Sequence, residues 1–104
     1  MIEIDENLDV VMSEEFAKGN MVILQFTSEL CDACVALEME LEEIDEKYDD
    51  ISILSIDCNE NDELVEYYDV YQTPTMIIFN SQKEMIYNGE GVMLYQDIEQ
   101  IMGR

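Results

Sequence analysis

The stretch Met21-Val-Ile-Leu-Gln-Phe-Thr-Ser-Glu-Leu-Cys-Asp-Ala-Cys34 decides the fold class, because it joins an apolar segment to a pair of cysteines. Near-continuous apolar runs of strand length, such as residues 21–26, are typical of strands that are covered on both faces. The pair Cys31 and Cys34 follows after a short polar link. We therefore expect the two cysteines at the end of a buried strand, where the next element begins.

The segment after the first cysteine has helical periodicity. Its apolar residues are spaced i, i+4, i+7 and i+11 and form one stripe, made of Leu37, Leu41, Ile44 and Tyr48. Acidic residues fill the positions between them and are expected on the solvent face: Glu38, Glu40, Glu42, Glu43, Asp45 and Glu46. The spacing predicts a helix from Cys31 to Tyr48.

The rest of the chain alternates between strand and helix patterns. Strands are expected at residues 2–4, 51–56, 75–79 and 84–87, with a hairpin turn at residues 80–83. Three further helices are identified by their apolar residues: Leu8, Val11, Met12 and Phe16 after Asn7 as N-cap and before Gly19; Leu64, Val65 and Tyr68 after Asn59 or Asn61; and Leu94, Ile98 and Ile101. The order predicts one α/β domain over residues 1–104, with helices on both faces of a central sheet.

The composition of the 104 residues excludes several classes of function. Histidine is absent, which removes Ser-His-Asp triads, Cys-His pairs and histidine metal sites. The formal net charge is −22, and such a surface opposes binding to nucleic acid and to anionic membranes. The charge suits a partner with a basic docking face. The alternative interpretation is that the acids only keep the protein soluble. No secretory signal or membrane span is visible, so we expect a cytoplasmic protein.

The pair Cys31-Asp-Ala-Cys34 has the chemistry of thiol–disulfide exchange. At a helix start the first sulfur lies beside unpaired N–H groups and the positive end of the helix dipole, which favours the attacking thiolate. The second cysteine follows one turn later and can resolve a mixed disulfide. A zinc site is the first alternative, but with Cys58 the chain offers only three sulfurs. A redox-inert core pair is the second.

The tripeptide Thr73-Pro74-Thr75 holds the single proline of the chain, directly before an apolar strand. A proline there fits either the first position of a strand or a cis turn. Cys58, which follows Asp57 at a strand end, is interpreted as a small buried or half-buried residue, with a regulatory thiol as the alternative.

With these motifs in place, the sequence resembles the thioredoxin family over essentially its whole length. The resemblance rests on the strand before the cysteines, Cys31-Asp-Ala-Cys34, the acidic helix ending at Tyr48, Ile56-Asp57, Thr73-Pro74-Thr75, and Gly91 before the last helix. It implies a thioredoxin fold with a central mixed sheet and reduction of disulfides in partner proteins, without a bound cofactor. A thioredoxin-reductase-type partner would regenerate the dithiol.

The resemblance also implies roles for single residues. Cys31 attacks the substrate and Cys34 resolves the mixed disulfide. The family's proline is cis and packs against the redox disulfide, so Pro74 shapes the site. Thr73 offers backbone pairing to an extended substrate, and the remaining apolar rim is formed by Leu30, Gly91 and Val92.

The sequence departs from the family at positions that tune the site. Leu30 stands where thioredoxins usually have tryptophan, and Met39 stands where they have a kinking proline. Gln25 replaces the buried aspartate, and Ile53 aligns with its partner lysine. The pair of residues that handles protons in the family is therefore absent.

Two carboxylates, Glu29 and Asp32, flank Cys31 in the sequence. At roughly 7 Å and an effective dielectric constant of about 40, one carboxylate opposes the thiolate by on the order of 1 kcal/mol. Weaker stabilisation of the thiolate disfavours the dithiol form. We therefore expect a reducing protein, at or below the value of about −270 mV that holds for thioredoxin.

Three rival functions remain open at this level. The first is an oxidase or isomerase of similar fold, and the second is a binding or adaptor subunit with little redox turnover. The third is a dedicated redox partner of one enzyme, selected by the acidic surface.

Overall fold

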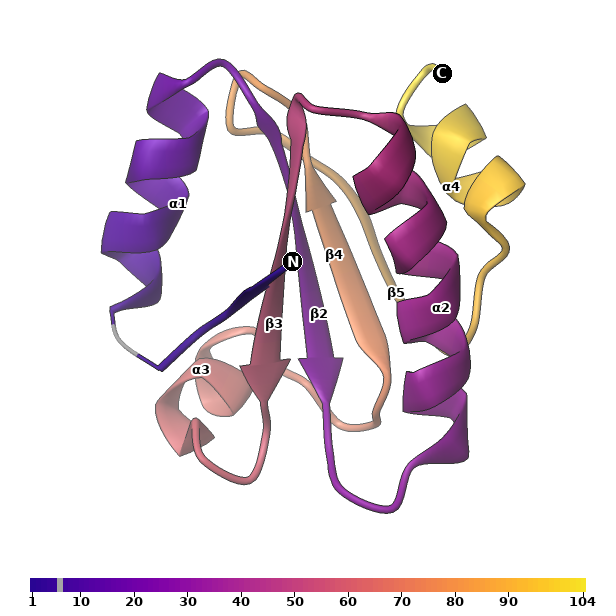
Figure 1. The fold of residues 1–104 in the computed structure, drawn as a ribbon. Coiled ribbons are helices and arrows are strands. Elements are labelled where there is room, and N and C mark those ends of the chain that lie inside the picture. The colour runs from indigo at the N-terminus through magenta and orange to yellow at the C-terminus, as the bar shows by residue number, and fades with distance from the viewer. Residues whose placement is uncertain (6) are drawn as a thin grey trace.

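The computed structural model describes residues 1–5 and 7–104 (Figure 1). Its elements follow the order β1 (Ile2–Glu3), α1 (Leu8–Ala17), β2 (Met21–Thr27), α2 (Asp32–Lys47), β3 (Ile51–Asp57), α3 (Asp62–Tyr67), β4 (Thr75–Phe79), β5 (Met85–Glu90) and α4 (Tyr95–Ile101). This is the order that the hydrophobic periodicity predicts. No helix in this described part of the chain is both long and apolar enough to cross a bilayer.

The five strands form one mixed sheet in the order β1-β3-β2-β4-β5. Strands β1, β3 and β2 are parallel, whereas β4 is antiparallel to both β2 and β5. The register places Thr27 opposite Asp57, and Phe26 opposite Thr75. The loop after β2, the loop after β3 and the segment before β4 therefore meet at the same end of the sheet.

Helices cover the sheet on both faces, as Figure 1 shows, with α2 and α4 on one side and α1 and α3 on the other. Successive residues of a strand point to opposite faces. Ile23 accordingly packs beneath α2, and Leu24 packs beneath α1. This double coverage explains why β2 is apolar at nearly every position. Gln25 is the buried polar exception.

The stripe predicted for α2 is confirmed, because Leu37, Leu41 and Ile44 are fully buried. The expectation that all intervening acids face solvent is wrong for two of them. Glu40 is half-buried and accepts a hydrogen bond from the backbone N–H of Tyr95 at 3.0 Å. Asp45 is half-buried against the Met1 ammonium group. Glu40 thus satisfies an N–H group at the start of α4, where Leu94 occupies the N-cap without a side-chain acceptor.

One boundary prediction is wrong, whereas one of the two N-cap candidates for α3 is confirmed by its position. Strand β5 runs over Met85–Glu90 and not over residues 84–87, because Asn80 Oδ1 accepts the Glu84 N–H and so keeps Glu84 in the turn. Asn61 occupies the N-cap of α3 but makes no capping hydrogen bond. Its amide donates instead to the Asp57 carbonyl at 2.8 Å.

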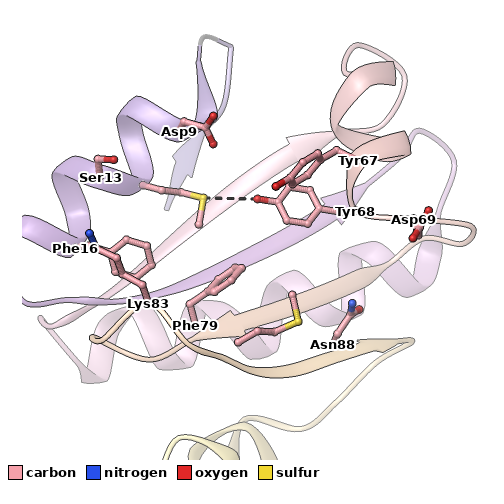
Figure 2. A pocket seen from close by; sticks show the side chains of 11 residues that line it. Asp9, Ser13, Phe16, Tyr67, Tyr68, Asp69, Phe79, Lys83 and Asn88 are labelled. Atoms are coloured by element: carbon pink, nitrogen blue, oxygen red, sulfur yellow. Dashed lines mark hydrogen bonds between the residues drawn. The ribbon is translucent and has the colours of Figure 1, made fainter.

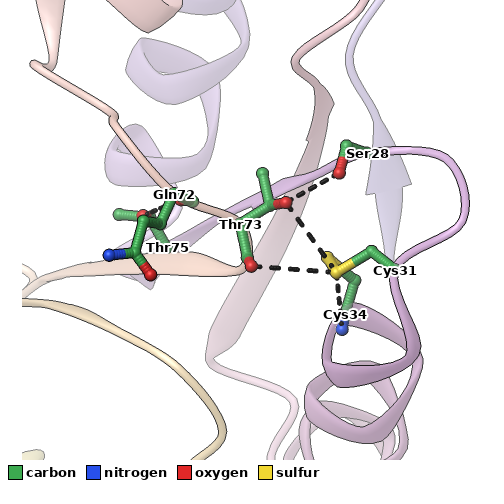
Figure 3. Close-up of a disulfide and its surroundings, with 6 residues drawn as sticks. All are labelled: Ser28, Cys31, Cys34, Gln72, Thr73 and Thr75. Atoms are coloured by element: carbon green, nitrogen blue, oxygen red, sulfur yellow. Dashed lines mark hydrogen bonds between the residues drawn. A yellow bond between two sulfur atoms is a disulfide. The ribbon is translucent and has the colours of Figure 1, made fainter.

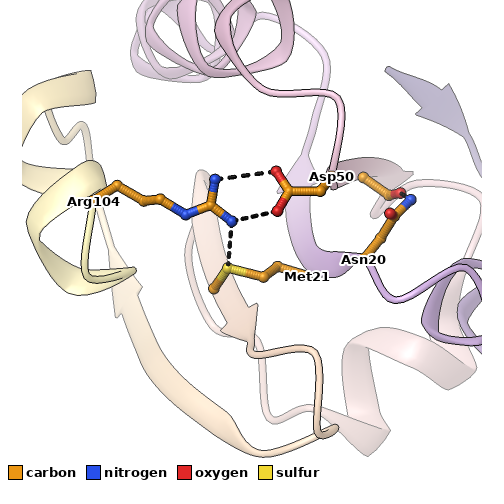
Figure 4. A network of polar contacts seen from close by, with 5 residues as sticks. Asn20, Met21, Asp50 and Arg104 are labelled. Carbon is orange, nitrogen blue, oxygen red and sulfur yellow. Dashed lines mark hydrogen bonds and ion pairs between the residues drawn. The ribbon is translucent and has the colours of Figure 1, made fainter.

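An ion pair stabilises the opposite end of the sheet, where β2 and β3 begin. Figure 4 shows Arg104 donating to both carboxylate oxygens of Asp50, at 3.0 and 2.6 Å. This pairing fixes the C-terminal end of the chain to the turn between α2 and β3.

Candidate active site

Cys31 and Cys34 lie at the junction of β2 and α2 and form a disulfide, with their Cα atoms 5.2 Å apart (Figure 3). Cys31 is the N-cap residue of α2, and its Sγ accepts the backbone N–H of Cys34 at 3.1 Å. The sulfur thus takes the place of the oxygen that normally caps a helix. A negative charge on Cys31 would be stabilised by the same N–H group and by the helix dipole.

The two sulfurs differ in their access to solvent. Cys34 is buried, with 4% of its surface exposed, because it lies on the inward face of the first turn of α2. Cys31, at the N-cap position, is half-buried. Cys31 is still the more accessible residue of the pair.

The segment before β4 lies against Cys31. The Thr73–Pro74 peptide bond is cis, which selects one of the two geometries left open by the sequence. Cys31 Sγ lies 3.8 Å from the carbonyl oxygen of Thr73 and 3.8 Å from its Oγ1. Thr75 Oγ1 donates to the Gln72 carbonyl at 2.6 Å and holds the turn around the buried Pro74.

The other residues predicted for the rim surround this segment. Gly91 donates its N–H to the Pro74 carbonyl at 2.9 Å, and its φ of 89° lies in the region that favours glycine. Leu30 has a φ of 53° and a fully exposed side chain. Val92 is exposed by 47%. The structure therefore brings five predicted rim residues to the same end of the sheet as the cysteines: Leu30, Thr73, Pro74, Gly91 and Val92.

A sequence model of the family described as Thioredoxin matches residues 4–103. This chain belongs to the thioredoxin family. It is 34% identical to Thioredoxin H5 of Oryza sativa subsp. japonica over 98 residues, which cover 92% of this chain and 73% of that protein. It is 31% identical to a thioredoxin of Chlamydia trachomatis serovar D, over 75% of this chain and 79% of that one.

Solved structures show the same fold at lower identity. A chloroplastic thioredoxin z structure superposes with a TM-score of 0.84 at 24% identity, covering 99% of this chain and 91% of that chain. The structure of the thioredoxin of Fasciola hepatica superposes with a TM-score of 0.83 at 17% identity, covering 100% of this chain and 98% of that chain. Family membership and a Cys-x-x-Cys pair at disulfide distance identify the chain as a thiol–disulfide oxidoreductase with a thioredoxin fold.

This thioredoxin-family chain has no ionisable residue at positions 25 and 53. Gln25 lies on the α2 face of β2, is 3% exposed, and donates through Nε2 to Met1 Sδ at 3.0 Å. Ile53 packs in the core on the same face. Met39, where the family has a kinking proline, is exposed and belongs to the continuous helix α2.

Glu29 and Asp32, the two residues predicted to tune the site by charge, are both exposed. Glu29 precedes the left-handed residue Leu30, and Asp32 opens α2. No ion pair among the described residues involves either carboxylate. Charges at such exposed positions are screened by salt.

Cys58 is a free, half-buried thiol just after β3, and its N–H donates to the Thr27 carbonyl at 2.8 Å. Burial, with a smaller contribution from Asp57, raises the pKa of the Cys58 thiol. A protonated thiol is a poor nucleophile at neutral pH. Cys58 lines a cavity of about 270 Å³ together with Ser28, Thr73 and Tyr71.

Ser28 is the residue at this site that the sequence interpretation missed. Its Oγ lies 2.7 Å from Thr73 Oγ1, across 45 positions of sequence. No local pattern signals such a contact, because it depends on the antiparallel register of β2 and β4.

Elsewhere the described residues include no cluster of three or more His, Cys, Asp or Glu side chains arranged to hold a metal ion. Figure 2 shows a separate groove of about 660 Å³ between α1, the end of α3 and the β4–β5 hairpin. Its walls include the rings of Phe16, Tyr67, Tyr68 and Phe79. None of the predicted site residues lines it.

Proposed function

We propose that this chain is a protein-disulfide reductase, in which the Cys31/Cys34 dithiol reduces disulfides of partner proteins. The observation that carries the proposal is the N-cap position of Cys31, where the sulfur accepts the Cys34 N–H at 3.1 Å while Cys34 is buried beneath it. An accessible sulfur at a helix start attacks, and a buried one resolves.

The proposed cycle transfers two electrons to the substrate. The Cys31 thiolate attacks one substrate sulfur, forms a mixed disulfide and releases the other substrate sulfur as a thiolate, which takes up a proton. Cys34 then loses its proton and attacks Cys31 Sγ. This step forms the Cys31–Cys34 disulfide and releases the second substrate thiol. A reductase partner returns two electrons, and the chain itself is proposed to need no bound cofactor.

An extended substrate segment would lie along Thr73. No described carbonyl or side chain accepts a hydrogen bond from the Thr73 backbone N–H, so this group is open for pairing. Tyr71 lines the same cavity as Thr73, and Leu30, Val92 and Tyr71 all have exposed apolar side chains. Pro74 and Gly91 shape the backbone of this rim through the bond between the Gly91 N–H and the Pro74 carbonyl.

The reductase partner is proposed to present a basic docking face. We call the carboxyl ends of β2 and β3, with residues 28–34 and 57–62, the redox end, and we call the amino ends of these strands the distal end. Lys18, Lys47 and Arg104 lie at the distal end, paired with acids, and Lys83 lies there in the β4–β5 turn. The redox end carries exposed acids without a basic residue: Glu29, Asp32, Glu60 and Asp62.

This charge distribution opposes nucleic acid and anionic membrane as partners. We propose that the protein works in the cytoplasm, in electron transport and redox homeostasis, because a reducing compartment keeps its dithiol available.

Insulin reduction with dithiothreitol tests the proposal. The wild-type protein is expected to accelerate insulin precipitation, and Cys31→Ser is expected to abolish the acceleration. Cys34→Ser is expected to accumulate mixed disulfide without turnover. Limiting iodoacetamide should modify Cys31 before Cys34, and the reverse preference would exchange their roles. An adaptor subunit would give no rate above background.

A reduction potential from glutathione titration separates a reductase from an oxidase or isomerase. A value of about −180 mV, which is typical of protein disulfide isomerase, would contradict the reductase proposal.

A further inference from the structure

Two hydroxyl groups form a pair beside the redox disulfide, and the cycle described so far uses neither. Ser28 Oγ lies 2.7 Å from Thr73 Oγ1, which lies 3.8 Å from Cys31 Sγ (Figure 3). Each hydroxyl has one proton to donate and lone pairs that accept. The three atoms therefore form a short chain, and its protons can point toward the sulfur or away from it.

Thr73 presents two opposing groups to Cys31. Its carbonyl oxygen lies 3.8 Å from Sγ and can only accept, so it favours a protonated thiol. Its hydroxyl, at the same distance, can donate and so favours a thiolate. The direction of the single Thr73 hydroxyl proton decides whether the donor is present.

We propose that Ser28 is a positioning residue whose hydroxyl donates to Thr73 Oγ1 and thereby directs the Thr73 proton onto Cys31 Sγ in the dithiol form. With Ser28 as the donor, Thr73 accepts one bond and keeps its own proton for the sulfur. In the reverse orientation, Thr73 donates to Ser28 and the sulfur loses its hydroxyl donor. A charged sulfur selects the first orientation, because charge-assisted hydrogen bonds are the stronger ones.

This inference rests on the proposed function, in which Cys31 is the attacking thiol. It deepens that function by explaining how a residue without contact to the sulfur sets the fraction of thiolate. A structural tether between the loop after β2 and the segment before β4 is the competing role for the same 2.7 Å contact.

The pH dependence of Cys31 alkylation by iodoacetamide tests the inference, with the modified site identified by mass spectrometry. Thr73→Val removes the donor and is expected to move the alkylation midpoint up by about one pH unit, a roughly tenfold loss of thiolate below the midpoint. Ser28→Ala leaves the Thr73 hydroxyl in place but undirected, so we expect about half a unit, or roughly threefold. Thr73→Ser keeps a hydroxyl and is expected to restore most of the wild-type midpoint.

The double variant provides the decisive comparison. If Ser28 acts through Thr73, Ser28→Ala adds no further shift in the Thr73→Val background. An equal shift in that background, or an unchanged midpoint in Ser28→Ala alone, overturns the proposal. Thermal unfolding is measured in parallel, and a loss of stability without a midpoint shift identifies a tether and also overturns it. The nearby titratable groups are the same in every variant: Glu29, Asp32, Cys34, Cys58 and Tyr71.

Alkylation needs no protein substrate, so the two proposals fail separately. If the wild-type protein does not reduce insulin but the midpoints shift as expected, the reductase function fails and the hydroxyl chain stands. If insulin is reduced and the midpoints do not move, only the role of Ser28 fails.

Discussion

The distal end and the redox end of the sheet differ in whether their charged side chains form ion pairs. Three basic side chains at the distal end are held by acids, in the pairs Lys18–Glu15 at 2.8 Å, Lys47–Glu99 at 2.6 Å and Arg104–Asp50 at 2.6 Å. At the redox end, Glu29 and Asp32 are exposed and make no ion pair among the described residues. The chain thus concentrates its few cations where they bind the fold together and leaves the exchange site negative.

The two ends also differ in how far their side chains are exposed to solvent. Glu15 at the distal end is buried, and its Oε1 accepts the Ser52 hydroxyl at 2.6 Å, while Asn20 donates to Ser52 at 3.0 Å. At the redox end, Leu30 exposes its whole side chain from a left-handed backbone position. The comparison indicates that the distal end supplies stability and that the redox end supplies access.

The largest effect is expected at the distal end, from Glu15→Ala. This change removes a charged acceptor from the buried Ser52 hydroxyl and should lower the free energy of unfolding by about 2 kcal/mol, roughly thirtyfold in the folding equilibrium. Insulin reduction by the folded variant should be unchanged. Urea denaturation and the insulin assay together measure both ends of the comparison.

The contribution of Glu15 is also expected to depend on pH. Bonds from Lys18 and Ser52 lower the pKa of the Glu15 carboxyl below its usual value. A carboxyl with a lowered pKa in the folded state stabilises above the pKa of the unfolded chain and loses that contribution as pH falls. The difference between wild type and Glu15→Ala should therefore shrink between pH 6 and pH 3. Glu14→Ala, an exposed neighbour on α1, is the matched control and should show neither effect.

The second expected effect is at the redox end, from the double variant Glu29→Gln and Asp32→Asn. Removing both carboxylates favours the Cys31 thiolate and therefore the dithiol form. The reduction potential should rise by about 30 mV, or tenfold in the equilibrium constant at low salt. Glutathione titration measures the change, which should diminish as salt screens the exposed charges.

The double variant Glu46→Gln and Asp49→Asn makes the same chemical change at exposed positions of the distal end and is the control. It should leave the potential unchanged. If it raised the potential as much as the change at Glu29 and Asp32, the total charge of the protein and not the location of the acids would set the potential. The acids at the redox end would then have no special effect on the reduction potential.

Periodicity predicted the element order and most of the core, because each depends on neighbours within one strand or helix. The Cys-x-x-Cys motif predicted where the thiols lie, since a helix start positions them locally. The buried Glu15 of α1 was not predicted, because its partner Ser52 lies on strand β3, 37 positions away. The contact between Ser28 and Thr73 was missed for the same reason. Both contacts depend on long-range packing, of α1 on the sheet for Glu15 and of β2 beside β4 for Ser28, which no local sequence pattern displays.

The smallest effect is expected from Gln25→Asp, which introduces a titratable group on the α2 face of β2. Resolution needs Cys34 as a thiolate, and burial in apolar surroundings disfavours that form. Gln25 can hydrogen-bond but cannot accept the Cys34 proton. A carboxylate could accept it, directly or through water. Because the proton already leaves by another route, we expect the mixed disulfide to resolve only about threefold to fivefold faster near neutral pH, well below the gain typical of a positioned base.

Gln25→Asn is the matched control, because asparagine has the size of aspartate without its proton chemistry. Stopped-flow reduction of a model disulfide should show faster release for Gln25→Asp than for Gln25→Asn, and thermal unfolding should establish that both variants remain folded. The wild-type rate should increase with pH as the Cys34 thiol loses its proton, and this dependence should flatten in Gln25→Asp. Equal rates and equal pH profiles in the two variants would mean that proton removal from Cys34 never limits the reaction. The slow step would then lie at the attack of Cys31 on the substrate, the step at which Thr73 and the surrounding acids are proposed to act.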